Sequence, residues 1–227
     1  MFTGLVREIG TLRTASRRGT VTKLWVHAPA SAPGLSLGDS LAVDGICLTV
    51  AGRRGDLVQL DAVNETRSVT TLATWRSGRR LHLEPALRAG DPLGGHLVLG
   101  HIDGVGVLRR RRRLGENLLL TFSAPDEVAT WLLPKGSIAI DGVSLTLDAG
   151  PFVEAFTVSL IPHTLSWTRF IEMKTGTRVN LEADVLAKGS AAGVARSASE
   201  TLRAAGEPRR GLTVNDITAR GFRRGRR

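Results

Sequence analysis

The residues best suited to chemistry occur in two matching segments of this 227-residue chain. Residues 44–49 read Asp-Gly-Ile-Cys-Leu-Thr, and residues 141–146 read Asp-Gly-Val-Ser-Leu-Thr. Each segment predicts a turn that enters a β-strand, because glycine permits a tight backbone and aspartate can accept hydrogen bonds from turn amides. Residues two apart on a strand share a face, so we expect Cys47 beside Thr49 and Ser144 beside Thr146.

A thiol or hydroxyl beside a threonine, over the mouth of a barrel, is suited to hydrogen-bond a flat polar heterocycle. The alternative is a capped turn whose threonine bonds to the backbone. Repetition of the segment in register favours the ligand-binding interpretation. The exchange of Cys47 for Ser144 suggests two related ligands handled in different roles.

A third candidate is His101, which interrupts an otherwise apolar stretch and corresponds to Leu5 in the first copy. A lone histidine in such a setting is either a general base or a satisfied or surface residue, and the sequence leaves both open. The five histidines and one cysteine show no metal-ligand spacing. No glycine-rich nucleotide loop or serine-elbow sequence is present either.

A duplicated scaffold must position these residues. Residues 4–10, 40–50 and 80–84 return as residues 100–106, 137–147 and 178–182. A period this long indicates two similar domains instead of a solenoid of short repeats. We therefore expect an N-terminal barrel over residues 1–93, a second barrel over residues 94–186 and a tail over residues 187–227.

The fold class expected for both copies is all-β. Short β-prone runs are separated by turns rich in Gly, Pro, Asp and Arg. Such strands hide their edges best by closing, which predicts a Greek-key barrel of about six strands in each copy. Helical signals are confined to residues 125–133, weakly to residues 28–35, and to residues 197–205, where Ser197 and Glu200 are spaced as a capping box. The predicted strands cover residues 24–27, 40–43, 57–62, 80–83, 118–122, 137–140, 156–161 and 177–181.

The amino-acid composition limits the compartments and the binding partners that are expected for this chain. One cysteine fits a reducing compartment, and we identify no signal peptide and no stretch of about 18 apolar residues, so we expect a cytoplasmic protein without a membrane span. The net charge of +10 raises the question of nucleic-acid binding. However, the arginines gather in runs 109–113, 209–210 and 223–227, which we expect to be solvated turns and tail. With no tyrosine and few aromatic residues, the chain offers little on which bases could stack.

Several motifs resemble the riboflavin synthase family, whose members carry two lumazine-binding repeats. The resemblance covers residues 1–186 and includes Met-Phe-Thr-Gly-Leu-Val at residues 1–6 and Gly-Gly-His at residues 94–96. It also includes Lys-Gly-Ser at residues 135–137 and Leu-Ile-Pro-His-Thr-Leu at residues 160–165. The segment that follows Lys188 departs from the apolar helix usual in the family, because it contains Gly189 and Gly193.

The resemblance implies a transferase reaction in riboflavin biosynthesis. Two molecules of 6,7-dimethyl-8-ribityllumazine undergo dismutation, in which one donates a four-carbon unit to the other. The products are riboflavin and 5-amino-6-ribitylaminouracil. The resemblance implies no metal or redox cofactor, and a homotrimer whose sites form between the first barrel of one subunit and the second barrel of its neighbour.

The resemblance also implies the residues of the site. The polar groups nearest the chemistry would be Ser40, Cys47, His101, Asp141 and Ser144. Substrate contact is expected for Phe2. One lumazine would be held by Gly4, Leu5, Val6, Cys47, Leu48, Thr49, Asp61, Ala62, Val63, Asn64, Glu65 and Thr66. The other would be held by Gly100, His101, Ile102, Lys135, Ser144, Leu145, Thr146, Ser159, Leu160, Ile161, Pro162, His163 and Thr164.

Three alternatives remain at this point. The first is a non-catalytic lumazine or flavin carrier of the same fold. Such relatives tend to lose the polar groups of one barrel, so the presence of Phe2, Cys47, His101 and Ser144 together favours the enzyme. The second is a variant enzyme that acts on a related lumazine. The third is a pair of basic barrels that binds nucleic acid.

Overall fold

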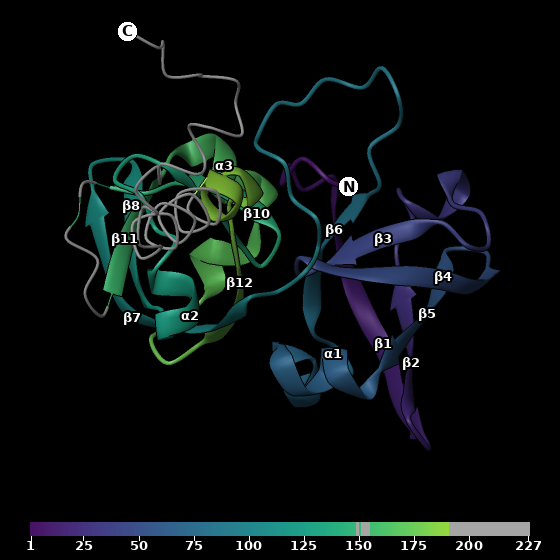
Figure 1. Cartoon of the computed structure of the whole chain (residues 1–227). Helices are drawn as coiled ribbons and strands as arrows, with labels where there is room; N and C mark the ends of the chain where they lie inside the picture. The colour runs from purple at the N-terminus through teal and green to yellow at the C-terminus, as the bar shows by residue number, and fades with distance from the viewer. Residues whose placement is uncertain (149, 151–154, 191–227) are drawn as a thin grey trace, which may run out of the picture. The chain divides into compact units, whose positions relative to one another are not determined.

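The computed structural model describes residues 1–148, 150 and 155–190. Figure 1 shows the strands of the first copy in purple to blue and those of the second in teal to green. The helix predicted over residues 197–205, and most of the predicted tail, lie outside the described residues. Residues 1–188 form one compact unit, and the predicted boundary between residues 93 and 94 falls in the connection between the two sheets.

The first copy is a closed, six-stranded, antiparallel barrel. Its strand order, β1-β2-β5-β4-β3-β6, confirms the predicted Greek-key class. The barrel includes a long first strand that the sequence analysis did not identify, with a register shift between Leu12 and Thr14. The strands are β1 (Glu8–Arg18), β2 (Val21–His27), β3 (Ser40–Val43), β4 (Ile46–Arg54), β5 (Leu57–Val63) and β6 (Arg80–Pro85).

The second copy has the same cyclic strand order, β10-β9-β12-β7-β8-β11. Its two outer strands are joined by a bridge between Leu147 and Val158. The equivalent order in both copies follows from the duplicated sequence. The strands are β7 (Gly104–Leu114), β8 (Asn117–Ser123), β9 (Ser137–Ile140), β10 (Val143–Thr146), β11 (Ala155–Leu160) and β12 (Arg178–Ala183).

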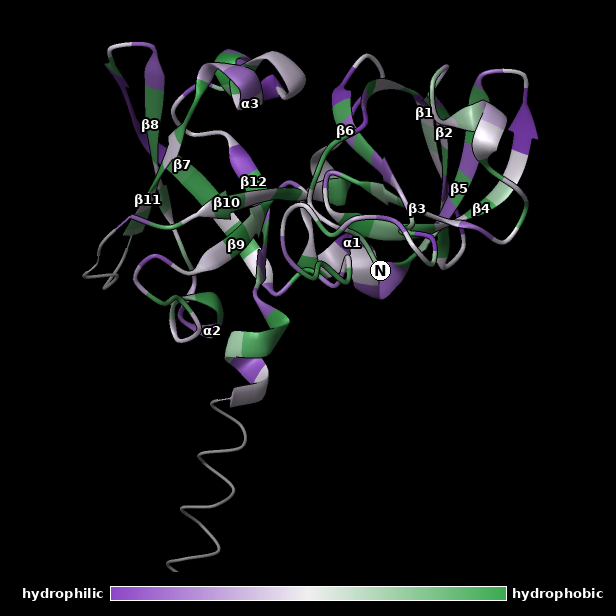
Figure 2. Cartoon of the chain, turned by 90° about the horizontal axis from the view of Figure 1, so that it is seen from above, coloured by the Kyte–Doolittle hydropathy of each residue, from purple (hydrophilic) through white to green (hydrophobic). Residues whose placement is uncertain are grey.

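Alternation of side chains along the strands builds one core in each copy. Along β5, for example, Val58, Leu60 and Ala62 are buried while the residues between them are not, an alternation of green and purple that can be followed in Figure 2. Strand residues two apart face the same side, so each strand gives one row of apolar side chains to its core. The two cores are separate clusters, and a small third cluster contains Phe2, Ala42, Val98 and Ala139.

Short helices follow the strands in both copies. The predicted helix at residues 125–133 is present but shorter, and the weak signal at residues 28–35 is a single 3-10 turn. The helices after β5 and β11 were not predicted, because six residues give too little apolar periodicity to detect. The helices are α1 (Asn64–Val69), α2 (Asp126–Ala129) and α3 (Pro162–Trp167), with 3-10 helices η1 (Ala32–Gly34), η2 (Thr71–Thr74) and η3 (Arg169–Glu172).

The arginine run at residues 109–113 corrects one prediction. These residues form the outer half of β7 and not a turn, paired with β8 across a register shift between Leu108 and Arg110. All five side chains are exposed, as expected of a solvated run. Arg111 nevertheless donates to the backbone carbonyls of Ile171 and Met173, at 3.0 and 2.9 Å, and so ties the strand to the end of η3.

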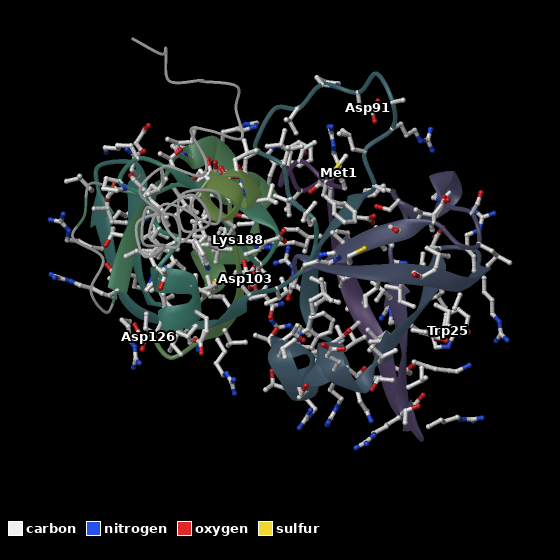
Figure 3. The ribbon with its side chains drawn as sticks, viewed as in Figure 1. Met1, Trp25, Asp91, Asp103, Asp126 and Lys188 are labelled. Atoms are coloured by element: carbon white, nitrogen blue, oxygen red, sulfur yellow. The ribbon has the colours of Figure 1, made fainter. Side chains whose placement is uncertain are left out.

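The compact unit ends at an ion pair. Lys188 donates to the Asp103 carboxylate at 2.8 Å, and Figure 3 shows the two residues together. Asp103 also accepts a hydrogen bond from the Ala183 backbone amide, so this carboxylate ties the end of β12 to the segment that enters β7. None of the helices that the structure describes is long and apolar enough to cross a membrane.

Candidate active site

The segment before β7 crosses over to the first barrel, where it lies against Cys47. The Cys47 amide donates to the Gly100 carbonyl at 3.0 Å. A Cβ added to Gly100 would lie only 2.5 Å from the Cβ of Cys47, so the glycine permits this approach. Ile102 packs against the core of the first barrel. Residues 100–102 therefore belong to the first pocket, although they precede the second barrel in sequence.

The N-terminal segment makes the reciprocal crossing to the second barrel. The Ser144 amide donates to the Gly4 carbonyl at 2.8 Å, and a Cβ on Gly4 would lie 2.6 Å from the Cβ of Ser144. Val6 packs against the core of the second barrel. These contacts correct the grouping implied by the resemblance. Gly4, Leu5 and Val6 lie with Ser144, and Gly100, His101 and Ile102 lie with Cys47.

Two equivalent glutamates hold the crossing segments. Glu84, at the end of β6, accepts hydrogen bonds from the amides of Thr3 and Gly4 at 2.7 and 3.0 Å. Glu182, at the end of β12, accepts from the amides of Leu99 and Gly100 at 2.7 and 3.0 Å. Burial raises the pKa of both carboxyl groups, that of Glu182 to about 7. Each glutamate thus fixes the backbone of the segment that crosses from its own copy to the other barrel.

The crossing at Cys47 forms a pocket of about 340 Å³. This volume is in the range of small-molecule sites. Cys47, Glu65, Thr66, Gly100, His101 and Ile102, all predicted site residues, line the pocket together. Ile46, Val69 and Thr70 also line it and were not predicted, because helix α1, which ends at Val69 with Thr70 as its C-cap, was not recognised. Val69 is exposed beside this pocket.

Polar residues form a row beside Cys47. Ser40 on β3 is paired with Thr49 on β4, which is paired in turn with Asp61 on β5. Directly paired residues of antiparallel strands share one side of the sheet. Because Leu48 and Val50 fill the barrel interior, this row and Cys47 lie on the outer face of the barrel. The expectation of a site over the barrel mouth was therefore wrong.

Ser144, which occupies the position of Cys47 in the second copy, takes part in a hydrogen bond that was not predicted. Nδ1 of His96 lies 2.7 Å from Oγ of Ser144, and the imidazole is almost fully buried. Burial lowers the pKa of His96, and Asp184 opposes this effect. No role was predicted for His96, because a histidine just after two glycines resembles part of a linker.

The two Asp-Gly turns meet back to back between the barrels. A Cβ on Gly45 would lie 2.7 Å from the Gly142 amide nitrogen. Asp44 accepts from the amide of His82 at 2.9 Å, and Asp141 accepts from the amide of Asn180 at 2.7 Å. The predicted bonds from turn amides to these carboxylates are thus replaced by bonds from the neighbouring strands.

Arg169 forms ion pairs with both aspartates and lowers the pKa of each relative to burial alone. It donates to Oδ2 of Asp44 at 2.9 Å and also to Oδ2 of Asp141. Burial would raise the pKa of Asp44, but Arg169, His82 and Arg79 bring it below its ordinary value. Burial raises the pKa of Asp141 to about 7, and the charge of Arg169 opposes this rise. No role was predicted for Arg169, because in a basic sequence it resembles one more surface arginine.

His82 and Asn180 complete this interface in equivalent positions. His82 donates from Nδ1 to the Asp141 carbonyl at 3.0 Å and accepts at Nε2 from the amide of Arg169 at 2.9 Å. Asn180 donates to the Asp44 carbonyl and accepts from the amide of Thr71, both at 2.8 Å. Each side chain therefore binds the opposite barrel with one donor and one acceptor.

Two predicted site residues lie in this interior. Asp141 has no exposed surface, and both its oxygens are engaged. Its catalytic role stays a prediction, and any effect must pass through the turn that leads to Ser144. Phe2 is also fully buried, and its backbone pairs with that of Val98. Direct substrate contact by Phe2 was a wrong expectation, because its ring lies in the small cluster between the barrels.

The remaining predicted residues divide by exposure. Lys135 is exposed in the turn before β9, with a left-handed φ of 62°. Thr164 is half-buried on α3. Exposed side chains are those of Val63, Asn64, Thr146, Ser159, Ile161, Pro162 and His163. Side chains that point into the cores, and could meet a ligand only through their backbone, are those of Leu48, Ala62, Leu145 and Leu160.

Comparison with known proteins agrees with this arrangement. A family model described as "Lumazine binding domain" matches residues 3–86 and again residues 99–184. The riboflavin synthase of Brucella abortus (strain 2308) is 37% identical over 196 residues, which are 84% of this chain and 96% of the relative. That of Bacillus subtilis (strain 168) is 37% identical over 188 residues, 83% of this chain and 87% of the relative.

Solved structures share the fold. The crystal structure of LumP complexed with riboflavin superposes with a TM-score of 0.73 at 24% identity, over 81% of this chain and 99% of that chain. The structure of LumP complexed with 6,7-dimethyl-8-(1'-D-ribityl) lumazine gives a TM-score of 0.72 at 22% identity, with the same coverage.

Among the described residues, no group of three or more His, Cys, Asp or Glu is placed to hold a metal ion.

Proposed function

The chain belongs to the riboflavin synthase family, with a lumazine-binding domain in each repeat, and on that premise we propose that it converts 6,7-dimethyl-8-ribityllumazine into riboflavin. Two substrate molecules react, one donates a four-carbon unit to the other, and 5-amino-6-ribitylaminouracil is the second product. The observation that carries this proposal is the pair of equivalent but chemically unlike sites, with His101 at Cys47 and His96 at Ser144.

The substrate supplies much of the reactivity. Its 7-methyl group is acidic enough to lose a proton, and the resulting carbanion attacks the partner molecule. The protein must then hold two flat rings face to face and move protons between them. In the first pocket we assign proton transfer to His101, because an imidazole can accept and donate a proton near neutral pH. Cys47 and Thr66 would orient the ring beside it.

The test is to incubate the purified chain with 6,7-dimethyl-8-ribityllumazine and to quantify both products. Riboflavin and the aminouracil should appear in equal amounts, with two substrate molecules consumed for each riboflavin formed. Addition of a chelator should leave the rate unchanged. Tight lumazine binding without turnover would instead identify a carrier, and turnover of only a related lumazine would identify a variant enzyme.

We further propose that each complete site combines the Cys47 pocket of one subunit with the Ser144 pocket of another, in a homotrimer. The pocket at Cys47 lies on the outer face of its barrel, where a second molecule can cover it. Large apolar side chains are exposed on the adjoining strand ends and helices, Val63 and Val69 in the first copy and Ile161 and Trp167 in the second. Large exposed apolar side chains near a site are suited to a protein–protein contact.

Mixed oligomers test this arrangement. His101→Leu damages only the Cys47 pocket, and Ser144→Ala damages only the Ser144 pocket. If sites form between subunits, co-expression of the two variants should give activity well above either variant alone, because some interfaces combine two intact pockets. Activity no higher than the mean of the separate variants would show that each chain carries its own site. Sedimentation analysis of the same samples would give the number of subunits.

The remaining partner and location predictions are narrower. We propose a small-molecule substrate and no nucleic-acid partner, because the arginine run at residues 109–113 lies along the outer half of β7 and does not line the pocket at Cys47. A cytoplasmic location remains a prediction from the single cysteine.

A further inference from the structure

The linker between the barrels carries two glycines that bring His96 to Ser144. A Cβ on Gly95 would lie 2.1 Å from the Thr3 carbonyl oxygen and 2.9 Å from the Cβ of Ser144, so no larger residue fits there. A Cβ on Gly94 would lie 2.7 Å from the Leu5 side chain. The His96 amide then donates to the Thr3 carbonyl at 3.2 Å. The backbone around His96 is therefore packed for close approach to Ser144.

Among the described residues, the side chain of His96 has one hydrogen-bond partner. Its Nδ1 lies 2.7 Å from the Ser144 Oγ, a distance typical of a well-formed hydrogen bond. Its Nε2 is buried and has no hydrogen-bond partner in the part of the chain that the structure describes. Because burial lowers the pKa of His96, the imidazole is neutral near neutral pH and offers one unprotonated ring nitrogen. The orientation of the serine hydroxyl thus depends on His96 alone among the described side chains.

The first pocket lacks such a pair. Cys47 occupies the position of Ser144, but no hydrogen bond of its thiol occurs among the described residues. The histidine of that pocket, His101, is exposed, whereas His96 is buried. The two linker histidines therefore differ: His101 can face a ligand directly, and His96 can act only through Ser144.

We propose that His96 is a positioning residue for proton transfer at Ser144, an inference that rests on the proposed function. Nδ1 accepts the hydrogen of the Ser144 hydroxyl, which leaves an oxygen lone pair of Ser144 free to face the substrate. When a C–H bond of the substrate 7-methyl group breaks, its electron pair stays on the ring. The proton goes to Oγ of Ser144 while the serine's own hydrogen passes to Nδ1 of His96. The pair returns to its starting state by the reverse transfer to a later intermediate.

The test compares His96→Leu with His96→Asn. Leucine cannot accept the serine hydrogen, whereas the Asn side-chain oxygen can occupy nearly the place of Nδ1. His96→Leu should lower kcat at least about 100-fold, the lower limit for general acid–base catalysis, while the lumazine Kd changes less than about threefold. His96→Asn keeps an acceptor for the serine hydroxyl but cannot take its proton, so it should restore less than about tenfold of the lost kcat. His27→Leu, a histidine on β2 outside the pocket at Cys47, is the control and should keep wild-type rates.

A double-mutant cycle shows whether His96 acts through Ser144. In a Ser144→Ala background, His96→Leu should change kcat less than about twofold, because the group that it positions is gone. Equal effects of His96→Leu in both backgrounds would overturn the inference, as would an Asn variant with the wild-type kcat. Loss of folding in both His96 variants, seen as loss of lumazine binding, would assign His96 a structural role and also overturn it. Absence of turnover in the wild-type protein would overturn the proposed function itself, whereas wild-type turnover with an unaffected His96→Leu would overturn this inference alone.

Discussion

Gly100 lies so close to Cys47 that its α-carbon has no room for a side chain. An added Cβ would be 2.5 Å from the Cβ of Cys47 and 2.8 Å from its amide nitrogen. The Gly100 φ of 81° would also strain any other residue. This contact is what attaches the second copy's segment, and His101 with it, to the first pocket.

Gly100→Ala should therefore both destabilise the protein and lower its turnover. The left-handed φ costs about 1–2 kcal/mol for a residue with a Cβ, and the overlap with Cys47 should add about 1–3 kcal/mol. The matched control is Gly78→Ala, at a φ of 87° with nothing within 4 Å of the added Cβ. Urea unfolding of both variants separates the two costs. Equal destabilisation would mean that the segment moves freely away from Cys47.

The crossing of segments is also where sequence reasoning failed. The repeat predicted the strands well, and the bounds of β3 and β9 agree with the predicted residues 40–43 and 137–140. The site residues carried over from the resemblance, however, grouped Gly4 with Cys47. Which barrel a segment packs against depends on contacts such as that of Gly4 with Ser144, which a repeat does not reveal. Arg169 was missed for a similar reason, since only the fold reveals the two buried carboxylates that face it.

His101→Leu should depress turnover strongly while lumazine still binds. A proton-transfer group contributes typically 10²–10⁴-fold to rate and much less to ground-state affinity. Steady-state kinetics together with lumazine fluorescence titration measure the two effects separately. The control is the double variant Leu5→His with His101→Leu, which moves the histidine to the equivalent position beside Ser144. If the pockets were interchangeable, this variant would recover turnover, and we expect that it does not.

Lys135→Gly should weaken substrate binding without loss of stability. Lys135 has a φ of 62°, and the equivalent residue of the first copy is Gly38, with a φ of 89°. A lysine kept in a strained conformation indicates a side chain that is needed. Glycine should leave the free energy of unfolding unchanged or raise it by up to about 1 kcal/mol, while the substrate KM increases. An unchanged KM would show that the strain at Lys135 serves no ligand, and thermal unfolding of the same variant checks the stability.

The last prediction concerns acid stability and His82. Burial lowers the pKa of His82 to about 4, although Asp44 opposes this shift. The neutral ring uses both nitrogens, donating to the Asp141 carbonyl and accepting from the Arg169 amide, so a second proton would break the latter bond. The ordinary pKa of histidine is 6.5, so between pH 6.5 and 4 the unfolded chain binds a proton that the folded chain excludes. His82 therefore contributes stability above pH 6.5 that is lost as the pH falls to about 4, by about 3 kcal/mol in total.

Asp141 and Glu182 titrate with the opposite sign. Burial raises the pKa of each to about 7, so their contribution is present at low pH and is lost as the pH rises through 7. The measurement must therefore be a difference between two proteins that keep both carboxyl groups. His82→Asn is suited to this, because Asn180 performs the equivalent donor and acceptor role in the second copy without titrating. Between pH 6.5 and 4, wild type should lose more unfolding free energy than His82→Asn, as urea denaturation at stepped pH would measure. Parallel curves for the two proteins would show that His82 does not remain neutral in the folded state.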